Sequence, residues 1–258
     1  MFGFLIKKSF FDLWDNFLPA ILINLGFIVI LTVPLLLPST AAAGGTAFGL
    51  AVLIVGVLLV FVFLGGAFAT AKEITDYAAP SWRSFIDGVK ELLPATAILG
   101  GIVVLHAFLL SVAVPVYSAL GNIVGLAALA FLFWMSVIWI LSAQYYLPIR
   151  TRLEPDIRKV LKKCFLLSFD NTGFTLGLAV GAVVIGVVSL FTAFLFPGIA
   201  GLAIWYQSAM RLRMYKYDYL EEHGDADRRA IPWDALLYDE RERVGKRTLR
   251  GMIFPWKE

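Results

Sequence analysis

Residues 16–71 read NFLPAILINLGFIVILTVPLLLPSTAAAGGTAFGLAVLIVGVLLVFVFLGGAFATA, and none of them is Asp, Glu, Lys or Arg. A bilayer core about 30 Å thick is crossed by an α-helix of about 20 apolar residues. The stretch is long enough for two such helices, and Pro38-Ser39-Thr40 with Gly44-Gly45 marks a turn between them. Backbone groups in lipid must bond to one another, which favours helices over open sheets. The stretch therefore predicts a transmembrane helical hairpin.

Two further stretches, 92–149 and 171–210, also lack charged residues and carry turn signals at Gly121-Asn122 and Pro197-Gly198. The sequence thus predicts an all-α integral membrane bundle of six transmembrane helices arranged as three hairpins. A five-span alternative requires the third stretch to be re-entrant. The predicted spans are Phe17–Leu37, Thr46–Phe68, Leu92–Ala113, Ile123–Ile140, Thr172–Ala193 and Leu195–Met210.

The composition agrees with a membrane protein. Hydrophobic residues make up 60% of the 258 positions and charged residues only 16%, whereas soluble domains average about 25% charged. These values exclude an ordinary soluble enzyme, a disordered chain and a nucleic-acid-binding domain. The single cysteine, Cys164, excludes an internal disulfide framework and a zinc cluster. No catalytic residues, cofactor or metal are predicted.

The orientation follows from the basic residues. Lys and Arg lie before residue 16, in 72–91, in 150–163 and after residue 210, and the three predicted hairpin turns contain none. Basic residues mark the cytoplasmic side of a span. We therefore expect a multi-pass protein of the cell (inner) membrane with both termini cytoplasmic. Residues 1–210 form the transmembrane domain, and 211–258 form a partly helical cytoplasmic tail with 11 basic and 10 acidic residues.

A weak repeat precedes the hairpins. It predicts an interfacial amphipathic helix before each hairpin, although convergence on similar interfacial sequences explains it equally well. Asn16 and Asn171 are expected to cap the spans that follow them. The matching segments are Ser9–Ala20 with Ser84–Ala95, and Lys7–Asn16 with Lys162–Asn171.

Polar side chains within the predicted spans are few. Asn24, His106 and Gln144 form the candidate intramembrane polar cluster, because polar residues in lipid are the first functional candidates. A serine-protease pairing with His106 has no Gly-x-Ser-x-Gly context to support it. A helix-to-helix hydrogen bond from His106 to Asn24 or to a backbone carbonyl is the favoured interpretation.

Two polar segments supply the remaining candidates. The basic loop is a candidate contact for lipid phosphates or a partner, although plain orienting charge explains it as well. In the tail, Pro-linked aromatics are candidate anchors that fold onto the bilayer or dock into a partner, with simple interfacial anchoring as the alternative. The loop candidates are Arg150, Arg152, Arg158, Lys159, Lys162 and Lys163, and the tail candidates are Trp233, Phe254 and Trp256.

Short motifs carry a resemblance to a known family. They are Pro38-Ser39-Thr40-Ala41-Ala42, Trp82-x-x-Phe85-x-x-Gly88, Leu147-Pro148 and 161–168, LKKCFLLS. Over about residues 10–210 the chain resembles the YesL-like family of uncharacterised bacterial multi-pass membrane proteins. The tail lies outside this resemblance.

The resemblance implies a non-enzymatic role accessory to a sugar ABC-type transporter or an envelope complex. The partners would be membrane lipids and an ABC transporter permease or another membrane complex bound at the cytoplasmic face, and no nucleic acid. A small-solute transporter or channel is the alternative function. An intramembrane enzyme is the third.

Overall fold

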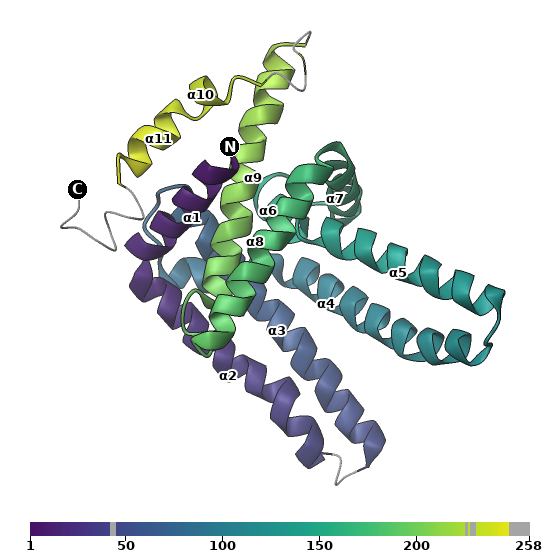
Figure 1. Ribbon diagram of the computed structural model, residues 1–258. Coiled ribbons are helices and arrows are strands. Elements are labelled where there is room, and N and C mark those ends of the chain that lie inside the picture. Colours follow the sequence, from purple (N-terminus) through teal and green to yellow (C-terminus); the bar gives the residue numbers. More distant parts are fainter. Residues whose placement is uncertain (42–44, 225–226, 228–230, 248–258) are drawn as a thin grey trace.

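The computed structural model describes residues 1–41, 45–224, 227 and 231–247, and over these residues the chain is all-helical (Figure 1). The helices are α1 (Phe2–Asp15), α2 (Phe17–Ala41), α3 (Thr46–Thr75), α4 (Trp82–Ala119), α5 (Ile123–Ala143), α6 (Tyr146–Arg152), α7 (Ile157–Asp170), α8 (Thr172–Phe191), α9 (Gly198–Glu222), α10 (Trp233–Leu236) and α11 (Tyr238–Val244).

Five helices in the described part are long and apolar enough to cross a membrane: α2, α3, α4, a segment formed by α5 and α6, and α8. Four of them begin at the residues predicted from the sequence, Phe17, Thr46, Ile123 and Thr172. Large apolar side chains on these helices stay exposed in the isolated chain, such as Val180 and Val183 of α8. This is the arrangement of a multi-pass membrane protein, whose outer surface meets lipid instead of water.

The helix α9 contains most of the predicted sixth span but begins at Gly198 instead of Leu195. It continues past Met210 to Glu222, as expected for a partly helical tail. It contacts α1, α2, α3, α6 and α8, and most of its first half is buried among them. Because its second half is charged, α9 is not among the five apolar helices, and the count of six spans stays a prediction.

The segment before the second hairpin also differs from the expectation. Ser81 caps α4, since its Oγ accepts the Ser84 N–H at 3.0 Å. From there the helix runs without a break through Pro94. The second predicted interfacial helix is therefore the first part of α4 and not a separate element.

The other two predicted interfacial helices are separate. The 14-residue helices α1 and α7 are each divided from the next apolar helix by one asparagine, Asn16 or Asn171. Each Nδ2 donates to a carbonyl four residues earlier, Asp12 O at 2.9 Å and Leu167 O at 3.3 Å. The prediction that these residues cap the following spans was wrong, because the amide donor satisfies a free carbonyl at the end of the preceding helix.

Two hairpins, α2–α3 and α4–α5, extend from the region around α9 and point in different directions (Figure 1). They meet through α3 and α4, which pack closely at a glycine. A Cβ added at Gly88 would collide with the Cβ of Ala69. The core lies where the helices converge, and in α5 only Gly125 and Ser142 are buried.

Candidate functional site

Asn24 is fully buried in α2 and holds the turn between α8 and α9. Its Nδ2 donates to the carbonyls of Leu195 and Pro197, each at 2.9 Å, and its Oδ1 accepts the Ala200 N–H at 2.9 Å. The side chain thus satisfies backbone groups that the turn and the first turn of α9 leave without helical partners. Beyond Asn24, α2 continues to Ala41, about 25 Å of helix. The α2–α3 hairpin therefore extends past the α8–α9 turn.

The structure does not bring Asn24, His106 and Gln144 into hydrogen-bond contact with one another. Gln144 donates from Nε2 to the Leu141 carbonyl at 2.8 Å and to the Thr175 carbonyl at 3.1 Å, which ties the end of α5 to α8. His106 lies in α4, and its buried Nε2 has no partner among the described residues. The three residues thus occupy three separate places.

The basic loop residues are also divided among different surroundings. Arg152 is buried and joins a network of charges, whereas Arg150 lies 3.9 Å from the carboxylate of Glu91. Lys163 pairs with Glu154 at 3.0 Å. Arg158, Lys159 and Lys162 are exposed on α7.

A network of six charged side chains lies where α1, α3, α6, α9 and α11 meet. We call it the central ion-pair network. It contains three cations and three carboxylates, so its formal charges balance. Its members are Lys8, Arg152, Arg211, Asp12, Asp76 and Glu240.

Glu240 of α11 is the most highly connected member of this network. Its carboxylate is 3.3 Å from Lys8 Nζ and 2.5 Å from Arg211 Nε. It also accepts the hydroxyl of Tyr77 at 2.5 Å and that of Tyr215 at 2.9 Å. The residue is only 1% exposed, so these partners replace the water that an ionised carboxylate otherwise requires.

Asp76, which follows α3, connects two arginines. Arg152 Nη1 contacts both of its carboxylate oxygens, at 2.8 and 3.1 Å, and Arg211 Nη1 binds one of them. Arg152 also donates to Thr75 Oγ1 at 2.6 Å and to Gln207 Oε1 at 2.7 Å. The guanidinium of Arg152 therefore joins α3, α6 and α9 through bonds that depend on its planar geometry.

Burial and charge act differently on the two carboxylates that face Lys8. Burial raises the pKa of Asp12 to about 6, although the Lys8 ammonium at 3.0 Å opposes this shift. Burial also opposes ionisation of Glu240, but Lys8, the Tyr77 hydroxyl and Arg211 together lower its pKa below the usual value. Asp12 is therefore the group that gains a proton first as the pH falls.

We expect the protein to become more stable as the pH falls from 7 to about 5. Folded Asp12 takes up a proton near pH 6, whereas the unfolded chain does so near 3.8. Below pH 4.5 the trend reverses, since protonation of Glu240 costs more in the folded state. Thermal midpoints measured against pH test this. Asp12→Asn should abolish the increase in thermal midpoint between pH 7 and 5 but keep the decrease below pH 4.5. A wild-type thermal midpoint that does not change between pH 7 and 5 would contradict the expectation.

The tail folds back onto the chain. Leu237 is fully buried and Val244 is 2% exposed. Arg247 binds Asp15 of α1 at 2.9 Å. Trp233 packs against the core, so this candidate anchor contacts the protein itself. The candidate anchors Phe254 and Trp256 lie outside the described residues.

Of the six members of the central ion-pair network, only Arg152 was a candidate from the sequence, as a contact for lipid phosphates or a partner. The i,i+4 spacing of Lys8 and Asp12 is a local signal that could have indicated their pairing, but the carboxylate that pairs with Lys8 from the tail could not be chosen among ten acidic residues. Asp76 and Arg211 were not candidates. No local signal identified them as partners, because their contact depends on how α3 packs against α9.

The chain was compared with family models, curated proteins and solved structures, and none of these comparisons gave a match.

Proposed function

We propose that this protein is a non-enzymatic multi-pass protein of the cell (inner) membrane that is accessory to a transport complex of the sugar ABC type or to an envelope complex. The observation that carries the proposal is how its polar side chains are used. Asn24 holds a turn, and Gln207 donates to the Phe68 carbonyl at 3.0 Å and to Thr151 Oγ1 at 2.8 Å. These groups join helices of the chain to one another, which favours a structural use of its polar side chains over a catalytic one.

The surface of the molecule supports the same proposal. The α4–α5 hairpin leaves Phe131, Phe133 and Trp134 more than half exposed. Such apolar faces suit lipid or the helices of another membrane protein. The YesL-like resemblance suggests the class of partner, an ABC transporter permease.

The partner is proposed to bind at the cytoplasmic face, through the exposed cations of α7. Arg158, Lys159 and Lys162 have no hydrogen bond from their side chains within the described part of the chain. Exposed charges of one sign speed association and select complementary partners. Acidic segments of a permease or lipid phosphates would supply the opposite charge.

Copurification from native membranes tests the proposal. The wild-type chain should recover subunits of a transporter or envelope complex, and the triple variant Arg158→Gln, Lys159→Gln, Lys162→Gln should lose them. A control with the same charge change at three other exposed cations, Arg83→Gln, Lys90→Gln, Lys246→Gln, should retain them. Recovery of no such subunit by the wild-type chain would refute the accessory role.

The orientation, with both termini cytoplasmic, is tested with a membrane-impermeant thiol reagent. Thr46→Cys and Leu120→Cys, at the tips of the two long hairpins, should react in intact cells. Glu222→Cys should react only after permeabilisation. The native thiol gives little background, because Cys164 is buried and burial raises its pKa to about 12. Labelling of Glu222→Cys in intact cells would show that the C-terminal tail is outside the cell, which contradicts the proposed orientation.

One observation favours the alternative of a small-solute transporter. His106 Nε2 and Gln144 Oε1 are buried without partners among the described residues, and unpaired polar atoms at such depth suit a solute path. Uptake of labelled neutral solutes into proteoliposomes tests it. A rate that depends on the protein and falls in His106→Leu would favour transport over the accessory role.

A further inference from the structure

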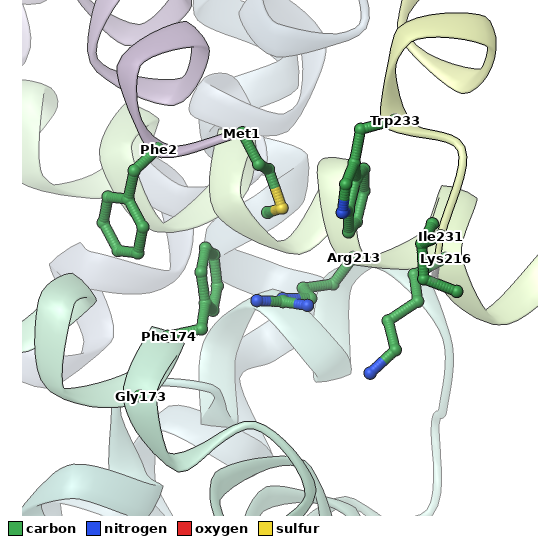
Figure 2. Close-up of a pocket in the computed structure, with 8 residues that line it drawn as sticks. All are labelled: Met1, Phe2, Gly173, Phe174, Arg213, Lys216, Ile231 and Trp233. Atoms are coloured by element: carbon green, nitrogen blue, oxygen red, sulfur yellow. The ribbon is translucent and has the colours of Figure 1, made fainter. Parts of the chain in front are cut away.

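A cavity of about 340 Å³ opens between the start of α1, the start of α8 and the middle of α9 (Figure 2). Phe2, Phe174 and Trp233 form apolar walls. Arg213 and Lys216 of α9 supply the charged side chains (Figure 2). Among the described residues that line this cavity, none is acidic. Its electrostatic character is therefore cationic.

Arg213 is the unusual residue of this cavity. It is 8% exposed, and within the described part of the chain it makes no hydrogen bond and no ion pair; its buried Nε has no partner. Its guanidinium carbon lies 3.7 Å from the Phe174 ring centroid and 5.8 Å from the Trp233 centroid. These rings make cation–π contacts with the guanidinium but offer it no hydrogen-bond acceptor. The N–H groups along its edge, which normally bind carboxylate or phosphate, stay without an acceptor.

The other buried cations show how this protein normally treats such charges. Lys8 contacts Asp12 and Glu240, and Arg152 contacts Asp76. A buried charge without a partner carries a desolvation cost that nothing offsets. Arg213 therefore lacks the anion that these other cations have.

One further feature favours an anion at the same place. Lys216 also lines the cavity, although its Nζ already contacts Asn171 Oδ1 at 2.8 Å and the Asp170 carboxylate at 3.4 Å. The first turn of α8 also lines it at Gly173, and the side chain of Asn171 does not cap that turn. Free N–H groups at a helix N-terminus attract phosphate.

We propose that this cavity binds a phosphate group, with Arg213, Lys216 and the first turn of α8 as its ligands. The apolar walls of Phe2, Phe174 and Trp233 take up the carbon portion of the phosphate ester. The site adjoins the point where α8 becomes apolar, at Thr172. This position matches the phosphate of an anionic phospholipid, and a soluble phosphate ester offers the same chemistry.

The test uses the purified full-length protein in micelles of dodecyl maltoside, a detergent without phosphate, with the charge-matched variants Arg213→Gln and Arg83→Gln. In one arm phosphatidylglycerol is added to the micelles, and in the other glycerol 3-phosphate is added to the buffer. Lipid retained in native mass spectrometry and the thermal midpoint are measured in both arms. Wild type and Arg83→Gln should bind at least one of these ligands. Arg213→Gln should bind it about tenfold or more weakly.

The two arms identify the source of the phosphate. Binding in the lipid arm alone assigns a lipid headgroup, and binding in the soluble arm alone assigns a free phosphate ester. Without either ligand, Arg213→Gln should melt no lower than wild type, because it removes an unpaired buried charge. If Arg213→Gln does not fold, Lys216→Gln takes its place. Equal binding by all variants, or none by wild type in either arm, overturns the proposal.

Discussion

Replacing Glu240 by glutamine is expected to destabilise the protein by about 3–5 kcal/mol, the usual cost of breaking a buried ion pair on one side. The substitution keeps the shape of the side chain but removes the charge that faces Lys8 and Arg211. Lys8 retains only Asp12 as a charged partner, and burial already disfavours ionisation of that carboxylate. Arg211 retains Asp76.

The measurement is the free energy of unfolding in nanodiscs, obtained by steric trapping or from thermal midpoints. Glu242→Gln is the matched control, because Glu242 lies on the same short helix and is exposed. It should change stability by no more than about 0.5 kcal/mol. Equal, small effects of the two substitutions would mean that α11 does not hold the bundle together.

This result also bears on how the tail is tested for partners. Deleting 231–258 removes Glu240 together with any docking aromatics, so loss of a partner would not distinguish docking from unfolding. Deleting 248–258 alone removes Phe254 and Trp256 and leaves the network complete. The shorter deletion is therefore the informative one.

The second large effect is expected at Asn24. Asn24→Leu keeps a similar volume but leaves two carbonyls and one N–H of the α8–α9 turn without partners. In apolar surroundings this should cost about 2–4 kcal/mol. Thr32→Val is the control in the same helix, because Thr32 is exposed and its hydroxyl bonds only to its own helix. Similar small losses from both substitutions would show that Asn24 does not hold the turn.

A double-mutant cycle tests the contact between Asn24 and the α8–α9 turn without relying on leucine to fill the volume of asparagine. Gly198 has φ near +60°, and a Cβ added there would collide with the Asn24 amide. Gly198→Ala should therefore be destabilising by itself. In an Asn24→Ala background its cost should be smaller, because the colliding atoms are gone. Strict additivity would indicate that the two residues do not contact each other.

The parts of the fold that were predictable from sequence depend on local signals. Charge-free stretches and Pro or Gly turns placed the starts of four apolar helices correctly. The predicted separate helix before the second hairpin was wrong because one local signal, the amphipathic pattern, was preferred to another, the absence of a helix end. The segment from Trp82 was read as a separate helix, but Ser81 provides the cap and no breaker follows it until Pro94. The second half of α9, which continues to Glu222, agrees with the partly helical tail that the sequence predicts after residue 210.

The candidate site was less predictable because its residues are distant in sequence. Asn24 was selected because it is a polar residue in an apolar stretch. Its partners, however, lie more than 170 residues away in a turn. Arg213 resembles the neighbouring Arg211 in sequence, yet only the packing of α9 against α1 and α8 separates a paired arginine from an unpaired one.

The Lys8–Glu240 contact joins α1 to α11, two helices that are synthesised far apart in time. Lys8 leaves the ribosome 232 residues before Glu240. Until α11 has been synthesised, Lys8 has only Asp12 as a charged partner, and the ion pair between α1 and α11 cannot form. A chain that terminates early can insert its apolar helices but cannot close the network. Chains interrupted before α11 are therefore expected to be less stable than chains that contain it, and more exposed to proteolysis.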